Sequence, residues 1–413
     1  AAQVLVPQGG TVVIGKDTRL SGYMFESALE AGFVAAGADV LLLGPLPTPG
    51  IARLTQEFDA DLGVVISASH NAFFDNGIKF FDRSGSKLTD DIEMKIEEHL
   101  KNPAITLESH QLGKAKRIDT ARIRYQDFCA ASMPDGINLE GMKVVFDGAN
   151  GAGYKVGPRA LANLGAEVIP IGCSPNGKNI NAGCGSMEPE LLQLTVPAVK
   201  GNVGVALDGD GDRVVMVDET GKLIDGDQLL YVLAMDRKSN GGLSGPVVGT
   251  VMSNLGLEHA LQAMDIDFRR AAVGDRYVLE TLRSTGGIIG GETSGHMLVL
   301  DKTTTGDGLI SALQVLAIMK RTGKPLSELV AGMPKYPQTM VNVRTERRLN
   351  PDESTAIQDA VAVAEGELAD KGRVVLRASG TEPVIRVMVE GEDAEQVVSL
   401  AKRLASIVAE AAA

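Results

Sequence analysis

Three aspartates in one short segment are the strongest chemical signal in this sequence of 413 residues. They are Asp208, Asp210 and Asp212. In a flat strand, alternate side chains lie about 6.6 Å apart, too far to share one cation, but Gly209 and Gly211 permit left-handed φ values that would curl the segment. Oxygen ligands favour Mg²⁺ or Ca²⁺. We therefore expect a Mg²⁺ site, with a metal-free acidic turn as the alternative; an EF-hand is disfavoured because Arg213 stands where its loop needs glycine.

A second polar segment, Ser67-Ala68-Ser69-His70-Asn71, comes directly after the apolar run 62–66. Open α/β sheets place their ligands at this end of a strand. Ser69 and His70 are adjacent, which is poor geometry for the base pair of a serine hydrolase, and no Gly-x-Ser-x-Gly elbow surrounds them. We interpret Ser69 as a phosphoryl carrier near the metal, with a simple turn cap as the alternative.

Three cations stand near this serine in the sequence. Lys79 follows it by ten residues, and Lys16 and Arg19 come at the end of another apolar run near the start of the chain. Positive charges of this kind balance the charge of roughly −2 that a phosphoserine carries. Solvent-facing loops are the alternative for each of them.

Two further glycine-bearing segments could bind a phosphorylated sugar. The first, 289–296, offers a carboxylate, hydroxyls and an imidazole that suit sugar hydroxyls; its candidates are Glu292, Ser294 and His296. The second, 377–386, offers backbone N–H groups, hydroxyls and guanidinium groups that suit a phosphate; its candidates are Arg377, Ser379, Gly380, Thr381 and Arg386. A hairpin turn and a surface turn are the respective alternatives.

The composition narrows the class of protein. Forty Lys and Arg against 53 Asp and Glu give a formal charge of −13, which argues against a nucleic-acid partner. No uncharged apolar run is long enough for a membrane helix, and the first residues show no signal peptide. Three cysteines, an odd number, favour a reducing compartment. We expect a soluble cytoplasmic protein without a membrane partner.

Apolar runs that alternate with helical periodicity indicate how these segments are positioned. The pattern recurs three times and predicts three related α/β domains, followed by a smaller α+β module. Pro- and Gly-containing segments divide the units. The predicted domains are 1–133 with the serine, 138–237 with the aspartates, 242–334 with the sugar segment and 338–413 with the phosphate segment.

Taken together, these segments resemble the α-D-phosphohexomutase family over nearly the whole chain and in the family's order. Ser67–Asn71 resembles its phosphoserine loop, 208–213 its Mg²⁺ loop, 291–296 its sugar loop and 377–383 its phosphate loop. Residues 15–19, 75–81, 179–181 and 184–186 favour the members that act on glucosamine phosphates. The resemblance implies mixed sheets in the three α/β domains and a TBP-like last domain, arranged around a central cleft.

The resemblance also implies roles for individual residues. Ser69 would carry the phosphoryl group and, with the three aspartates, bind one Mg²⁺ ion. Lys79 and Lys16 would transfer protons or stabilise oxygen charge, and Arg19 would screen the phosphate. His70 and Arg213 join them as catalytic candidates. Glu292, Ser294 and His296 would contact the sugar, and the loop after Arg377 would hold the phosphate that does not react.

The implied reaction interconverts glucosamine 6-phosphate and glucosamine 1-phosphate through phospho-Ser69 and a glucosamine 1,6-bisphosphate intermediate. The partners are a hexosamine phosphate, an activating kinase or autophosphorylation at Ser69, and a second copy in a homodimer. Alternatives are a phosphoglucomutase/phosphomannomutase, a Mg²⁺-dependent phosphatase and a non-catalytic sugar-phosphate binding protein. We also expect a hinge near 334–337. The family usually opens with a Gly-Thr-Asp-Gly-Ile-Arg-Gly strand, so the resemblance implies that some tens of N-terminal residues are missing here.

Overall fold

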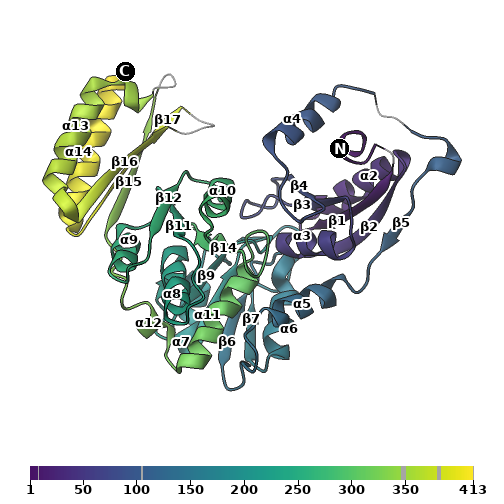
Figure 1. The fold of residues 1–413 in the computed structure, drawn as a ribbon, viewed down its shortest axis with the longest axis horizontal. Coiled ribbons are helices and arrows are strands. Elements are labelled where there is room, and N and C mark those ends of the chain that lie inside the picture. Colours follow the sequence, from purple (N-terminus) through teal and green to yellow (C-terminus); the bar gives the residue numbers. More distant parts are fainter. Residues whose placement is uncertain (8, 104–105, 346–349, 379–382, 413) are drawn as a thin grey trace.

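The computed structural model describes residues 1–7, 9–103, 106–345, 350–378 and 383–412. The chain builds four sheets in sequence order (Figure 1). The N-terminal unit and the C-terminal unit stand at opposite sides of the molecule, with the other two units between them (Figure 1). No helix in the described ranges is long and apolar enough to cross a membrane.

The first sheet has the strand order β4-β3-β1-β2-β5. All neighbours are parallel except β3 and β4, which are antiparallel. Its strands are β1 (Gly10–Lys16), β2 (Ala38–Pro45), β3 (Leu62–Ile66), β4 (Ile78–Asp82) and β5 (Ala115–Arg117). The helices of this part of the chain are α1 (Ala2–Leu5), α2 (Ser21–Ala35), α3 (Thr48–Glu57), α4 (Asp90–His99), the 3₁₀ turn Ser109–Gln111 and α5 (Ala121–Ala131).

The second sheet has the order β10-β9-β8-β6-β7. Its strands are β6 (Lys143–Asp147), β7 (Glu167–Ile171), β8 (Val203–Leu207), β9 (Val214–Val217) and β10 (Leu223–Ile224). The 3₁₀ turn Ala152–Tyr154 and helices α6 (Val156–Asn163) and α7 (Glu190–Ala198) accompany it. Strand β6 is parallel to both neighbours, whereas β8 and β9 are antiparallel, with Leu207 opposite Val214. The aspartate segment is therefore the connection of a hairpin, and the flanking strands exclude an EF-hand.

The third sheet has the order β12-β11-β13-β14. Its strands are β11 (Val247–Thr250), β12 (Phe268–Ala271), β13 (Ile289–Gly291) and β14 (Met297–Val299). The helices are α8 (Gly226–Ser239), α9 (Leu255–Gln262), α10 (Asp275–Thr285), α11 (Gly308–Thr322) and α12 (Leu326–Leu329). Only β13 and β14 are antiparallel, so the sugar segment, like the aspartate segment, connects the two strands of a hairpin.

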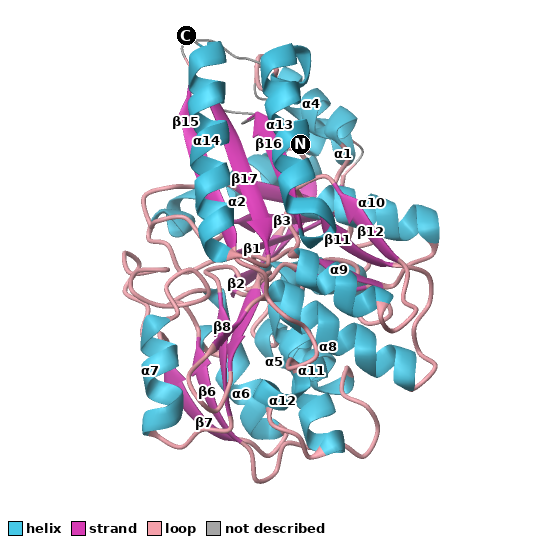
Figure 2. Ribbon diagram, turned by 90° about the vertical axis from the view of Figure 1, so that its left-hand side faces the viewer, coloured by secondary structure: helices cyan, strands magenta, loops and turns pink. Residues whose placement is uncertain are grey.

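The C-terminal sheet is antiparallel throughout, in the order β15-β17-β16. Its strands are β15 (Gln338–Arg344), β16 (Gly372–Ala378) and β17 (Val384–Gly391). Two 3₁₀ turns, Pro351–Glu353 and Ala369–Lys371, and the helices α13 (Thr355–Leu368) and α14 (Ala394–Ala412) complete it. Buried Val397, Leu400, Ala401, Leu404 and Val408 recur at helical spacing, so one stripe of α14 packs on the sheet (Figure 2).

The apolar cores show which units are joined. One large cluster of buried side chains draws on the first three sheets and includes Val65, Phe146 and Leu313. The opposite face of each of these sheets has a smaller cluster of its own. The C-terminal module has a separate core that contains no residue before Val341. The expected fold class, three α/β domains with mixed sheets and a smaller α+β domain, is confirmed; the domain limits stay predictions.

Candidate active site

The side chain of Ser69 meets the aspartate hairpin of the next unit. Ser69 lies in the loop after β3, and its Oγ donates a hydrogen bond of 2.7 Å to Oδ2 of Asp208. Its φ is +49°, an uncommon value for a residue with a Cβ, so other contacts must hold it there. Two residues 139 positions apart are thus brought into direct contact.

The three aspartates form a buried cluster. Asp208, Asp210 and Asp212 are 0%, 1% and 5% exposed, and one carboxylate oxygen of each lies within 4.8 Å of the others. Oδ1 of Asp210 and Oδ1 of Asp212 have no hydrogen-bond partner in the described part of the chain. Burial, and then repulsion from the other two aspartates, raises the pKa of Asp208. Converging, partly unpartnered carboxylates of this kind fit a divalent cation.

Lys79 supplies positive charge to this cluster from β4. Its Nζ lies 2.7 Å from Oδ2 of Asp210 and 3.3 Å from Oδ2 of Asp212. Burial by itself would lower the pKa of Lys79, but the charges of Asp210 and Asp212 outweigh burial and raise it above its usual range. The amine is therefore held protonated.

Thr48, at the start of α3, is a contact that the sequence did not reveal. Its hydroxyl donates to Oδ2 of Asp210 over 2.6 Å, and its backbone N–H donates to the carbonyl of the same residue over 2.8 Å. Burial would raise the pKa of Asp210, but the Lys79 charge and the hydrogen bonds from Lys79 and Thr48 hold it below its usual range. Asp210 is the carboxylate most firmly kept ionised.

Only one of the two glycines of the hairpin has the left-handed backbone conformation that we expected of both. Gly211 has a left-handed φ of +73°, as predicted, but Gly209 is not among the residues with positive φ. A Cβ at Gly209 would lie 2.7 Å from the carbonyl oxygen of Ser69 and 2.8 Å from Nδ2 of Asn181. Gly209 is thus explained by close approach of the serine loop, and not by curling of the hairpin.

Buried polar side chains fix the backbone of the serine loop. Arg19, 1% exposed, donates from Nη2 to the carbonyls of Ser69 and Asn71 over 3.3 and 2.6 Å. Its other amino group pairs with Asp17. Nδ2 of Asn181 donates to the same two carbonyls over 3.0 and 2.9 Å. The loop conformation, including the strained Ser69, is therefore set by one cation and one amide from different units.

Replacing Asn181 with alanine should loosen this loop without removing a reacting group. We expect kcat to fall by about ten- to a hundredfold, because small misplacements of reacting groups carry penalties of this size. The measurement is turnover of a hexose phosphate by the purified variant, with Asn240→Ala, an exposed asparagine at the end of α8, as the control. An Asn181→Ala enzyme with the turnover of the control would show that Arg19 alone suffices.

The remaining predicted catalytic residues, Lys16, Arg213 and His70, each have different surroundings. Lys16 is fully buried, pairs with Glu26 and lies 3.7 Å from the centre of the Tyr23 ring. Among the described residues, its amine forms no hydrogen bond or ion pair with Ser69 or the three aspartates. The backbone N–H of Arg213 donates to Oδ1 of Asp208 over 3.2 Å. Burial, and then the Arg213 charge, lowers the pKa of His70. The roles of these residues stay predictions.

The sugar segment packs directly on the aspartate hairpin. Arg213 and His296 form an antiparallel bridge, and Val214 donates its N–H to the carbonyl of Gly295 over 3.0 Å. His296 is 3% exposed, and neither ring nitrogen has a hydrogen-bond partner among the described residues. Glu292 accepts from the N–H of Gly274 over 3.0 Å. Ser294 is exposed. The structure therefore brings the serine, aspartate and sugar segments together.

Two arginines of the C-terminal module face each other across neighbouring strands. Arg377 on β16 pairs in register with Arg386 on β17, and both line a cavity of about 110 Å³. Burial, and then the Arg386 charge, lowers the pKa of Arg377, whereas the charge of Glu292 acts in the opposite direction. Two like charges beside a cavity suit an anion. The predicted Ser379, Gly380 and Thr381 lie outside the described residues.

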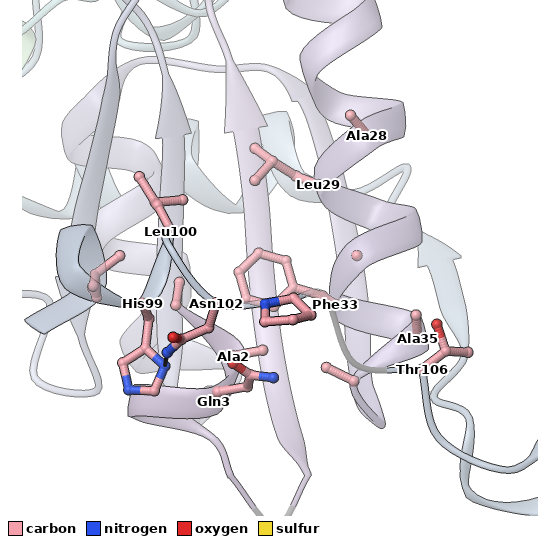
Figure 3. Close-up of a pocket in the computed structure, with 15 residues that line it drawn as sticks. Ala2, Gln3, Ala28, Leu29, Phe33, Ala35, His99, Leu100, Asn102 and Thr106 are labelled. Carbon is pink, nitrogen blue, oxygen red and sulfur yellow. Dashed lines mark hydrogen bonds between the residues drawn. The ribbon is translucent and has the colours of Figure 1, made fainter.

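A further pocket of about 420 Å³ lies among α1, α2 and α4, where Leu29, Phe33 and Leu100 line it (Figure 3). None of the predicted site residues is among those that line it. It is mainly apolar and belongs to another part of the N-terminal domain.

Comparisons with known proteins agree with this arrangement. Four models of the phosphoglucomutase/phosphomannomutase family match in order: domain I at residues 1–105, domain II at 124–221, domain III at 225–336 and the C-terminal domain at 340–407. A phosphoglucosamine mutase of Thioalkalivibrio sulfidiphilus is 54% identical over 99% of this chain and 91% of its own length. One of Aeromonas hydrophila is 55% identical over 99% and 92%.

Solved structures share the fold at lower identity. A phosphoglucomutase/phosphomannomutase family protein of Burkholderia thailandensis is 24% identical with a TM-score of 0.82, covering 99% of this chain and 91% of that one. The N-acetylphosphoglucosamine mutase of Aspergillus fumigatus, in complex with GlcNAc-6P and magnesium, is 18% identical with a TM-score of 0.66, covering 89% and 93%. On the strength of the full-length relatives and the four domain matches, this chain belongs to the phosphoglucomutase/phosphomannomutase family of phosphohexomutases.

Proposed function

We propose that this enzyme interconverts glucosamine 6-phosphate and glucosamine 1-phosphate. The observation that carries the proposal is the 2.7 Å contact between Oγ of Ser69 and a buried cluster of three aspartates. The relatives that are 54–55% identical over nearly the whole chain are phosphoglucosamine mutases, which favours glucosamine over the other sugars of the family.

We assign the metal site to Asp208, Asp210, Asp212 and the oxygen of Ser69, and we propose that the ion is Mg²⁺. The unpartnered oxygens of Asp210 and Asp212 support this assignment, since buried carboxylates need a counter-charge. When bound, the ion would neutralise charge that develops on the transferred phosphoryl group. We propose one ion per chain, held by this cluster.

In the proposed reaction, the Oγ–P bond of phospho-Ser69 breaks as a sugar oxygen forms the new O–P bond, and the sugar hydroxyl gives its proton to a nearby base. The product is glucosamine 1,6-bisphosphate, whose other phosphoryl group returns to Ser69 after the sugar has turned in the site. Lys79 is held protonated by two carboxylates, so it is suited to stabilise oxygen charge and not to accept that proton. Lys16 and His70 remain candidates for the base, and Arg19 keeps the serine loop in place.

We propose that Glu292, Ser294 and His296 orient the sugar, while Arg377, Arg386 and the loop between their strands hold the phosphate that does not react. Binding energy at that distant phosphate would fix the reacting oxygen near Ser69. The opposed arginines and the effect of Glu292 on Arg377 support a shared ligand.

The direct test compares glucosamine 6-phosphate with glucose 6-phosphate and mannose 6-phosphate at equal concentrations with Mg²⁺. We expect the highest kcat/KM for the glucosamine compound. A preference for glucose or mannose phosphate would assign the enzyme to a different substrate within its family. Release of inorganic phosphate without isomerisation would indicate a phosphatase, and no turnover of any of the three would favour a binding protein.

Three partner and location proposals accompany this function. Ser69 would first be phosphorylated by a kinase or by autophosphorylation, which intact mass before and after phosphatase treatment would reveal. A homodimer is supported by exposed Leu20, Tyr23 and Phe74, and light scattering would measure it. The three free cysteines support a reducing compartment such as the cytoplasm.

A further inference from the structure

One residue of the sugar segment, Thr293, makes a contact away from the aspartate hairpin. Its Oγ1 donates to Oδ2 of Asp227 over 2.7 Å, and its carbonyl accepts from the N–H of Gly226 over 3.1 Å. Asp227 is 1% exposed and lies in the first turn of α8. The first turn of α8 therefore holds the sugar segment through Thr293.

The same carboxylate oxygen is connected to the segment that leads into the C-terminal module. Oδ2 of Asp227 also accepts from the N–H of Asn254 over 2.9 Å. The Asn254 side chain binds Tyr336 at both backbone groups: Oδ1 accepts from its N–H and Nδ2 donates to its carbonyl, each over 3.0 Å. Thr293, Asp227, Asn254 and Tyr336 thus form an unbroken chain of hydrogen bonds.

Tyr336 belongs to the connection between α12 and β15, which further contacts anchor. The carbonyl of Pro337 accepts from the N–H of Gly391 over 3.1 Å, and Lys335 pairs with Asp225. Glu390 of β17, fully buried, accepts from the N–H of Leu255 over 2.9 Å. These contacts attach the C-terminal module to the residues around Asn254.

A cavity of about 440 Å³ adjoins this chain of contacts and is lined by Asp227, Asn254, Thr293 and Tyr336 among others. Packing around the four residues is therefore incomplete on one side, so their hydrogen bonds carry much of the connection. Burial, and then the Asp225 charge, raises the pKa of Asp227 to about 6. Burying a carboxylate costs free energy, so its presence here favours a specific role of Asp227 in positioning.

We propose that Asp227 is a positioning residue that couples the sugar segment to the phosphate-binding module through Thr293 on one side and Asn254 on the other. This proposal rests on the sugar-binding and phosphate-binding roles proposed above for the two segments. Its function would be to keep the two at a fixed separation, so that a sugar phosphate held at both ends presents its reacting oxygen to Ser69.

The test removes the Thr293 hydroxyl and then restores it. Thr293→Val is nearly isosteric, and we expect KM for glucosamine 6-phosphate to rise about three- to tenfold, as for one lost hydrogen bond. Thr293→Ser should return KM to near the wild-type value. Thr281→Val, at a half-buried position of α10 where the hydroxyl donates to the carbonyl of Tyr277, is the matched control and should leave KM unchanged.

Two readouts separate positioning from general destabilisation. Hydrolysis of phospho-Ser69 by water needs no bound sugar, so it should be the same in Thr293→Val as in the wild type. In a double-mutant cycle with Asn254→Ala, the effects on KM should be non-additive, because both variants break one connection. Any of three results would overturn the proposal. The first is a wild-type KM for Thr293→Val, and the second is additive effects on KM in the double variant. The third is a loss in the rate of phospho-Ser69 hydrolysis by water that equals the loss in kcat/KM.

The backbone provides a measurement that does not depend on the reaction. Amide hydrogen exchange of Tyr336 should be faster in Thr293→Val than in Thr281→Val without any substrate, since the chain of contacts is broken at its far end. Unchanged exchange at Tyr336 would count against the coupling. If the wild type turns over no glucosamine phosphate, the proposed function fails, whereas the exchange experiment still decides whether the coupling exists.

Discussion

Ser69→Ala should lower turnover of glucosamine 6-phosphate by at least about a thousandfold, because loss of a covalent nucleophile leaves only binding and electrostatic contributions. This hydroxyl is the group that we propose carries a phosphoryl group between the two ends of the sugar. Its removal also deletes the 2.7 Å hydrogen bond to Asp208, but that bond does not explain an effect of this size. Formation of glucosamine 1-phosphate, followed by a coupled assay, is the measurement.

The comparison that gives this result meaning is Ser109→Ala, an exposed serine in a 3₁₀ turn of the same domain. That variant should keep wild-type turnover. The mass of the wild-type chain should also fall by one phosphate after phosphatase treatment, and the mass of Ser69→Ala should not. A Ser69→Ala enzyme with most of its activity would mean that another group carries the phosphate.

Asp210→Asn should raise the Mg²⁺ concentration needed for half-maximal activity by at least about tenfold, since outer partners of metal ligands alone contribute ten- to a hundredfold in affinity. Asp210 is the aspartate that Lys79 and Thr48 keep ionised, so the neutral amide removes a full charge from the cluster. Activity would be titrated with Mg²⁺ after removal of bound metal by a chelator.

The effect on stability should accompany the effect on activity. Mg²⁺ should raise the melting temperature of the metal-free wild type, because an ion that binds the folded state alone stabilises it, and the rise should be smaller in Asp210→Asn. Asp135→Asn, an exposed residue shortly after the end of α5, is the control for both measurements. If Mg²⁺ titration curves of Asp210→Asn and the control coincide, the aspartate cluster is not the metal site.

Much of the fold could be predicted from local pattern. The apolar run 62–66, interpreted as a strand, forms a strand with these bounds. Apolar runs, and the alternation of strand-like with helix-like segments, involve only residues close together in the sequence. One sequence is therefore enough to recognise them. The polar segments were recognisable for the same reason, because their chemistry is concentrated in a few consecutive residues.

Contacts between units could not be predicted in this way. Thr48 and Asp210 are 162 positions apart, and Asn181 is 112 positions from Ser69. Nothing local marks Thr48, which starts an ordinary helix after proline. Asn181 had a signal, since it lies in a segment that favoured the glucosamine-phosphate members, but the sequence did not say what it holds. The sequence likewise did not reveal that Lys16 pairs with Glu26; its predicted catalytic role stays a prediction.

The division of the apolar cores has a consequence for how such a chain can change over time. Substitutions in any of the first three units alter one continuous interior, so those units must adapt to one another whenever one of them is modified. The last unit has an interior of its own, and it meets the third unit through hydrogen bonds and through apolar side chains such as Met252 and Met388, which line one small cavity. Substitutions inside the last unit therefore require fewer compensating changes elsewhere than substitutions in the shared interior do.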